Sequence, residues 1–150
     1  MNTRGFTLVE VLVVLGLLFL LTTFGSVASF FYFRTQYVYH VAETIANELR
    51  LVQVASLTQS DDASHGIKIF ESTMTRFTGS SYAGRNTSKD VQTTFPVSVT
   101  VSGSQEVVIP AGQYGPASTS LTTITNNGIV IDISLTTYGV LTITNRTVGY

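Results

Sequence analysis

The chain has 150 residues, a formal net charge of −1, 44% hydrophobic residues and a mean hydropathy of +0.32. This length suits one small domain with little left over. The lack of cysteine excludes disulfides, thiol catalysis and cysteine metal sites. The balanced charge lacks the basic excess with which proteins bind nucleic acid, so we expect no nucleic-acid partner.

The N-terminal fifth of the chain is its most apolar part. Residues 1–5 are short, polar and end in glycine, whereas residues 11–33 are 23 residues without a charge. A helix of about 20 apolar residues is long enough to cross the hydrocarbon core of a bilayer. We therefore predict a transmembrane helix over residues 6–33. Arg4 precedes it and Arg34 follows it; the basic start before the apolar run favours a cytoplasmic N-terminus.

The helical pattern continues past the apolar segment, where apolar residues recur at spacings of three and four. They are Val38, Val41, Ile45, Leu49 and Val52. The polar residues mostly take the opposite side of the helix, namely Glu43, Asn47, Glu48, Arg50 and Gln53. This is the pattern of an amphipathic helix, and no proline precedes Pro96 to interrupt it. Residues 34–58 are thus predicted to extend the same helix, which ends near Leu57.

From residue 59 onward the apolar period changes to two, which is typical of half-buried antiparallel strands. The alternating segments are residues 67–70, 97–102, 129–136 and 141–144. Residues 72–94 show little alternation, and residues 79–86 are expected to form an exposed loop. Residues 59–150 therefore form a β-rich domain. Because a sheet with one apolar face needs a cover, we expect the helical stripe to pack on it, giving an α+β fold.

The start of the chain resembles a known signal. Gly5-Phe6-Thr7-Leu8-Val9-Glu10, followed by the uncharged run, resembles the class III signal of type IV prepilins and pseudopilins. In that family a prepilin peptidase cuts after the glycine and methylates the new N-terminus. The resemblance implies cleavage between Gly5 and Phe6, removal of residues 1–5 as a leader, and N-methylation of Phe6. It also implies a pilin-like fold.

Two further segments refine the resemblance. Residues 46–56 and 140–146 are similar to the distal helix and last strand of the H-type minor pseudopilins of type II secretion. The chain lacks both the proline in the apolar helix and the C-terminal disulfide that many pilins carry. This departure argues against a major, fibre-forming pilin.

Glu10 fits this family for a physical reason. A carboxylate at the head of a lipid-embedded helix costs up to ~2.5–3.5 kcal/mol near the bilayer centre. Cleavage after Gly5 creates an ammonium group at Phe6, one helical turn away, which can pair with Glu10 of the same chain or of a neighbour. Pairing between neighbours would fix the axial register of a filament, since an unpaired buried charge is strongly penalised. The alternative is that Glu10 only lies at the membrane interface.

The remaining polar residues suggest no chemistry. The sequence contains neither a nucleophile-elbow motif nor a phosphate-binding loop, so we expect no enzyme activity and no cofactor. His65 lies near Asp61 and Asp62, where a solvated loop is preferred to a divalent-cation site. Arg85, Lys89 and Arg146 are too scattered to indicate DNA binding. The residues expected to form a polar and aromatic belt at the membrane interface are Tyr32, Tyr37, Tyr39 and His40.

The resemblance implies a structural subunit, a minor pilin or pseudopilin, of a type IV pilus or type II secretion-like filament. Its partners would be the prepilin peptidase, other pilin or pseudopilin subunits, the inner-membrane assembly platform and membrane lipid. It would cross the cytoplasmic (inner) membrane once and become extracytoplasmic in the filament. The alternatives are a signal-anchored cell-surface binding or adhesion module, and a secreted domain cut after Ala28 by ordinary signal peptidase.

Overall fold

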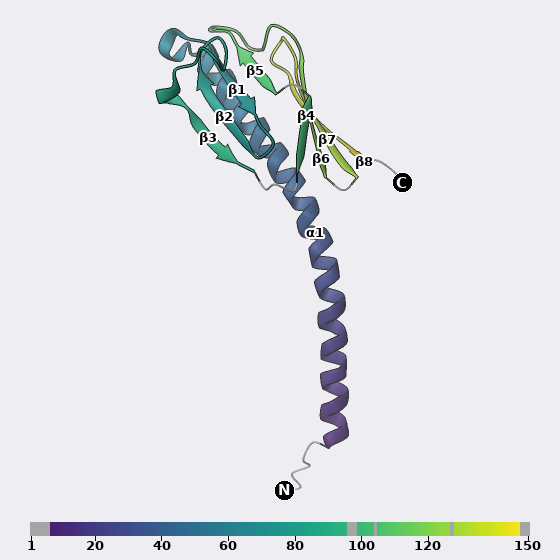
Figure 1. The fold of residues 1–150 in the computed structure, drawn as a ribbon. Coiled ribbons are helices and arrows are strands. Elements are labelled where there is room, and N and C mark those ends of the chain that lie inside the picture. Colours follow the sequence, from purple (N-terminus) through teal and green to yellow (C-terminus); the bar gives the residue numbers. More distant parts are fainter. Residues whose placement is uncertain (1–6, 96–98, 104, 127, 148–150) are drawn as a thin grey trace. The chain divides into compact units, whose positions relative to one another are not determined.

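The computed structural model describes residues 7–95, 99–103, 105–126 and 128–147. The chain divides into two compact units, Met1–Arg34 and Thr35–Tyr150. One helix, α1 (Leu8–Leu57), supplies the described helical residues of the first unit and the opening segment of the second (Figure 1). It ends where the apolar period of the sequence changes from that of a helix to that of a strand.

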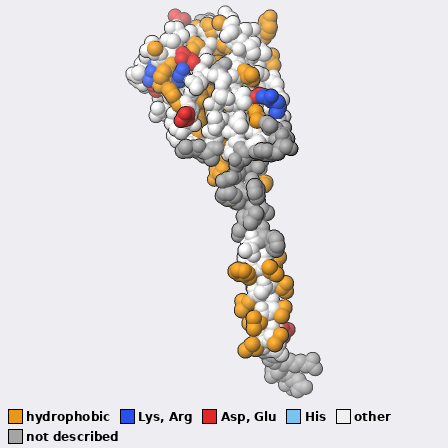
Figure 2. Space-filling model, turned by 45° about the vertical axis from the view of Figure 1, so that its right-hand side comes forward, with side chains coloured by type: hydrophobic (Ala, Val, Ile, Leu, Met, Phe, Trp, Pro, Cys, Tyr) orange, Lys and Arg blue, Asp and Glu red, His pale blue; other side chains and the backbone are white. Residues whose placement is uncertain are grey.

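In the first unit the apolar side chains of α1 face outward. Each leucine, valine and phenylalanine between Leu8 and Leu21 is at least 47% exposed. Figure 2 shows these hydrophobic side chains along the described part of the helix. A helix that is apolar all round is normally covered by other apolar groups, and the described residues of this unit supply no such cover.

In the second unit the predicted stripe of α1 is buried. Its five members are at most 2% exposed, and they are Val38, Val41, Ile45, Leu49 and Val52. They form one hydrophobic core with residues of both β-sheets, including Ile67, Ile109, Ile124 and Ile133. The helical spacing of three and four residues explains this burial, because it places the five side chains on one face.

The second unit contains two antiparallel four-stranded sheets (Figure 1). The first sheet has the order β3 (Val91–Thr94), β2 (Thr73–Thr78), β1 (His65–Ile69) and β5 (Glu106–Ile109). The second has the order β4 (Thr100–Gly103), β6 (Ser120–Asn126), β7 (Ile129–Leu135) and β8 (Leu141–Thr147). Short 3₁₀ turns, η1 (Ser60–Asp62) and η2 (Thr87–Lys89), lie after α1 and before β3. The predicted α+β fold class is confirmed.

The sequence pattern located only some of these strands. It correctly placed β1, β7 and β8, and residues 79–86 do form a loop before η2. It found little alternation in residues 72–94, which contain β2 and β3, and it did not find β5 or β6. Of the predicted segment 97–102, residues 100–102 lie in β4, and residues 97 and 98 lie outside the described residues. In β2 the buried residues Met74, Thr75 and Phe77 break the simple alternation of apolar and polar types.

The polar side of α1 also differs in part from expectation. Arg50 and Asn47 are exposed, as expected of the solvent-facing side, and Arg50 donates a hydrogen bond to the Asn47 side-chain oxygen. Glu48, however, accepts a hydrogen bond of 2.9 Å from Arg76 Nε on β2. Gln53 Nε2 donates to the carbonyl oxygens of Tyr114 and Gly139, at 3.0 and 2.8 Å. These two side chains therefore tie the helix to the sheets and loops rather than facing solvent.

Candidate functional site

The cleavage and methylation residues predicted from the sequence, Gly5 and Phe6, lie outside the described residues. Thr7 is the first described residue, and its side-chain oxygen accepts a hydrogen bond of 3.2 Å from the backbone N–H of Glu10. The Thr7 carbonyl accepts another, also 3.2 Å, from the N–H of Val11. This is the geometry of a helix N-cap. Thr7 thus fixes the start of α1 directly after the predicted cleavage site.

Glu10 lies in the first turn of α1, three residues after its cap. Its side chain is exposed, and among the described residues no ion pair includes it. A carboxylate near a helix N-terminus interacts favourably with the helix dipole, by about 0.3–1 kcal/mol at an exposed position. The structure therefore presents Glu10 with its carboxylate available to an external cation.

Thr7 is a residue that the sequence argument missed. The signal was present, because Thr7 and Glu10 have the S/T-x-x-E spacing of a capping box. Only the first of the two capping-box bonds, from the Glu10 N–H to the Thr7 hydroxyl, is formed here. The backbone N–H of Glu10 therefore takes part in the helix cap, while its side chain is exposed.

Replacing Thr7 by alanine should loosen the first turn of α1 by about 1 kcal/mol, because the Glu10 N–H loses its acceptor. Amide hydrogen exchange of Glu10, measured by NMR on the full chain in detergent micelles, should become about fivefold faster. Thr7→Ser keeps the hydroxyl and should leave the rate almost unchanged. Equal rates in all three proteins would show that the cap does not hold this turn.

The two histidines lie in different environments. His65 is the first residue of β1 and is 6% exposed, so the expectation of a solvated loop was wrong for this residue. Its Nε2 lies 2.9 Å from the Ser60 carbonyl oxygen and its Nδ1 lies 3.3 Å from the Thr78 hydroxyl. Within the described ranges, no three His, Cys, Asp or Glu side chains are grouped as metal ligands would be. His40 is exposed and lines a shallow pocket with Tyr37 and other residues. The tyrosines of the predicted belt are all partly exposed, with Tyr32 62%, Tyr37 47% and Tyr39 36%.

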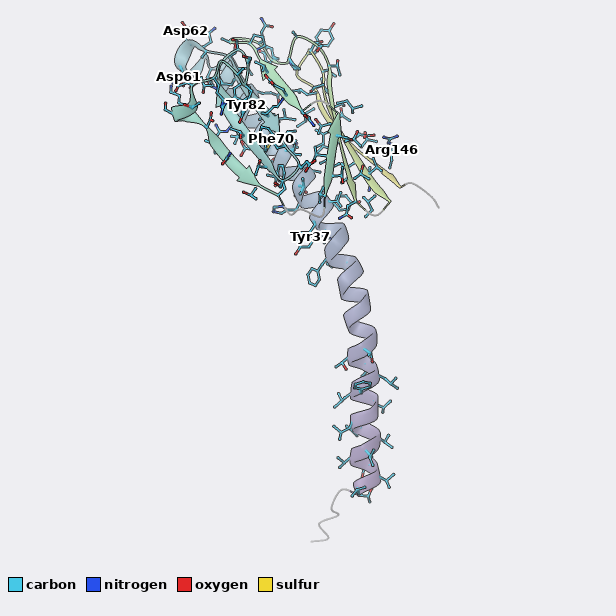
Figure 3. The ribbon with its side chains drawn as sticks, in the orientation of Figure 1. Tyr37, Asp61, Asp62, Phe70, Tyr82 and Arg146 are labelled. Carbon is cyan, nitrogen blue, oxygen red and sulfur yellow. The ribbon has the colours of Figure 1, made fainter. Side chains whose placement is uncertain are left out.

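The loop after β2 is held together by one tyrosine. The ring of Tyr82 contacts Phe70 and Phe77 edge-to-face, with 5.6 Å between centroids in each pair (Figure 3). The Arg85 guanidinium lies 3.6 Å above the Tyr82 ring centroid and donates a 2.8 Å hydrogen bond to Asp90. That bond to Asp90 raises the pKa of Arg85 above its ordinary value.

The three scattered basic residues each meet a carboxylate. Besides Arg85, Lys89 Nζ lies 2.5 Å from an oxygen of Asp61, and Arg146 donates to Asp132 at 2.7 Å. The hydrogen bond from Lys89, helped by its charge, lowers the pKa of Asp61. Each of these three basic side chains therefore lies beside an acidic partner.

Comparisons with known proteins bear on the N-terminus. No helix within the described residues has the length and hydropathy needed to cross a membrane. No curated protein and no solved structure matches the chain. A family model described as the prokaryotic N-terminal methylation motif matches residues 1–26. That motif implies processing by a prepilin peptidase and indicates a structural subunit rather than an enzyme. The chain carries a type IV pilin-like prepilin leader.

Proposed function

We propose that the chain is a minor pilin or pseudopilin, a structural subunit of a type IV pilus or type II secretion-like filament. Prepilin peptidase cuts between Gly5 and Phe6 and methylates Phe6. Before assembly, residues 6–33 anchor the chain once in the cytoplasmic membrane with its N-terminus in the cytoplasm. In the filament the same residues pack against the helices of neighbouring subunits, and the β-rich domain is displayed outside. The H-type pseudopilins of type II secretion are the class it most resembles.

The observation that carries this proposal is the methylation motif at residues 1–26, which includes an apolar helical segment whose large side chains are at least 47% exposed. Among the described residues the large apolar side chains from Leu8 to Leu21 are at least 47% exposed, which suits a cover of lipid first and of sister helices afterwards. Helix association in a membrane depends on packing rather than on the hydrophobic effect, because lipid tails are as apolar as leucine. A transfer from lipid to a helix bundle therefore involves no large change in apolar exposure.

Glu10 supports the same mechanism. An incoming subunit enters a bundle of low dielectric, where its Glu10 carboxylate is stabilised only by a nearby cation. The methylated amine of Phe6 on a neighbouring subunit is such a cation. Pairing between these two groups sets how far one subunit is displaced along the filament relative to the next.

The mature N-terminus tests the proposal. Protein purified from its native host should begin at Phe6 and carry one added methyl group, as read by intact mass and N-terminal peptide sequencing. In a host strain without prepilin peptidase the same protein should begin at Met1. A native chain that begins at Met1 would instead indicate a signal-anchored binding module, and one that begins at Ser29 a secreted domain. Either result would overturn the filament assignment.

A further inference from the structure

The outer edge of β8 is the longest unpaired strand edge among the described residues. β8 has seven residues, whereas the other three edge strands, β3, β4 and β5, have four each. It pairs with β7 on one side only. Natural edge strands are commonly protected by proline, lysine or a bulge. β8 contains neither proline nor lysine, and its pairing with β7 runs from end to end without a bulge.

The register shows which backbone groups point outward. The N–H of Thr136 donates to the carbonyl oxygen of Val140. These two residues continue the β7–β8 register by one step beyond the pair of Leu135 and Leu141, and they form a hydrogen-bonded pair. In an antiparallel ladder, hydrogen-bonded and non-hydrogen-bonded pairs alternate. Leu141, Ile143 and Asn145 therefore direct their N–H and C=O groups away from β7. Among the described residues, these backbone groups have no partner across the edge.

The side chains at the same positions lie on the inner face of the sheet. Ile143 is directly opposite Ile133, which is 1% exposed, yet Ile143 itself is 43% exposed. Asn145 is held by a hydrogen bond to the Tyr39 hydroxyl on α1. The apolar layer under the second sheet is thus left open along β8.

Apart from Arg146, the edge is also free of charge. Residues 138–145 contain no Asp, Glu, Lys or Arg, and Arg146, at the end of β8 (Figure 3), is paired with Asp132. An added strand would place side chains next to Leu141 and Ile143, where apolar groups are favoured, and beside Thr142 and Thr144 on the other face, where polar groups are favoured. The complementary strand is therefore uncharged, with apolar and polar residues in alternation.

We propose that β8 binds such an extended strand from a different subunit of the filament, which adds a fifth strand to the second sheet. Backbone hydrogen bonds to Leu141, Ile143 and Asn145 hold the strand, and its apolar side chains cover the open layer. That the strand comes from a filament subunit rests on the proposed function. Binding of the strand itself does not.

A second copy of this chain is the less suitable donor. Antiparallel pairing of β8 with β8 requires a two-fold axis perpendicular to the sheet, and this axis reverses every direction lying in the sheet plane. The segment of α1 that packs on the sheets would then run in opposite directions in the two copies. Subunits extracted from one membrane into one filament have their helices running in the same direction, so a different subunit is the expected donor.

Two isomeric peptides test the edge without knowledge of the natural partner. Both alternate threonine and valine over eight residues, four of each, with capped ends. One carries N-methyl groups on its threonines and the other on its valines. Only the first keeps the valine N–H groups that must pair with β8 when the valines face the apolar layer. The protein is the full chain in detergent micelles, observed by residue-resolved amide hydrogen exchange.

The threonine-methylated peptide should slow exchange at Leu141, Ile143 and Asn145 by at least about tenfold, without affecting the β7-paired Thr142 and Thr144. The valine-methylated isomer should have no effect. Equal behaviour of the two peptides, or no protection up to about 1 mM, would overturn the proposal. Exchange that is already slow in peptide-free protein, with the chain dimeric in micelles, would assign the edge to a second copy instead.

A pair of variants gives an independent check on the protein side. Ile143→Pro removes an outward N–H that β7 does not use, and proline is tolerated at such edge positions. It should weaken the active peptide about tenfold, whereas Ile143→Val, which keeps the N–H, should change binding less than about twofold. Equal binding by both variants would contradict the proposed backbone hydrogen bonds between β8 and the peptide. These experiments involve no leader processing, so their failure would leave the proposed function intact. Likewise, a mature N-terminus other than Phe6 would leave strand binding by β8 intact.

Discussion

Glu10→Ala is expected to reduce incorporation of the chain into filaments at least tenfold, on the order of the loss caused by breaking a buried ion pair. The physical reason is the ammonium group of Phe6 that a neighbouring subunit brings into the bundle. Without Glu10 that cation is left unpaired in a medium of low dielectric. The measurement is the fraction of protein found in sheared filaments relative to the cell membrane, by quantitative immunoblot.

Membrane insertion and the β-rich domain should be unaffected by this change, because the Glu10 side chain makes no ion pair among the described residues. Glu43→Ala is a matched control. It removes an exposed acid from the same helix, also without an ion pair in the described structure, and should leave incorporation at the wild-type level. The mature N-terminus of each variant must be checked, since a loss of cleavage would block assembly for another reason. Wild-type incorporation of a correctly processed Glu10→Ala chain would refute the pairing mechanism.

Helical periodicity was the strongest signal in this sequence. The apolar stripe from Val38 to Val52 was predicted from spacing alone, and every member is buried. Its success has a simple cause: a helix covering two sheets needs one continuous apolar face, and a period of 3.6 residues shows this directly. Contacts across the fold were not predictable in this way. Glu48 and Arg76 are 28 residues apart and meet only because β2 lies beside the helix.

The missed strands have a different cause. Thr75 and Thr122 are buried, at 0% and 3% exposure, although a polar residue is normally taken to mark the outer face of a strand. Threonine has a β-branched side chain that suits either face of a strand. In a domain rich in threonine, the buried and exposed faces of a strand therefore cannot be told apart by residue type. The open edge of β8 was also hidden, because strand order cannot be derived from the residues of one strand.

The candidate site was predicted from the resemblance of residues 5–10 to a prepilin signal, and the energetic cost of the Glu10 carboxylate supported that prediction. Glu10 is a single carboxylate directly before the uncharged residues 11–33, where a charge is costly. The amine that cleavage would create at Phe6 is a cation that could pair with it. The helix cap at Thr7 escaped notice although its spacing to Glu10 was visible. The family motif drew attention to the scissile bond, and the ordinary physics of a helix start was overlooked beside it.

Gly66→Ala is expected to have the largest effect on the β-rich domain. Gly66 is buried in β1, directly opposite Phe77 of β2. A Cβ atom at this position would lie 2.6 Å from Phe77 Cζ and 2.7 Å from the carbonyl oxygen of Val107. Both distances are well inside van der Waals contact. The strand pairing therefore depends on the absence of a side chain here.

Neither neighbour can move away easily. The Phe77 ring is 1% exposed and is held edge-to-face against Tyr82. The Val107 carbonyl belongs to the backbone of β5, which pairs with β1 on the other side. Overpacking of this kind costs about 1–3 kcal/mol when side chains can adjust. A clash with backbone belongs at the upper end, so we expect a loss of about 2–3 kcal/mol.

The loss should appear as a lower midpoint of urea unfolding for the full chain in micelles, followed by tyrosine fluorescence because the chain has no tryptophan. Gly84→Ala is the matched control. Its Cβ would meet only the Ser81 hydroxyl, at 3.4 Å, and its backbone needs no positive φ. That variant should unfold within about 0.5 kcal/mol of the wild type. If both variants unfolded alike, the pairing of β1 with its two neighbours would not depend on the absence of a side chain at Gly66.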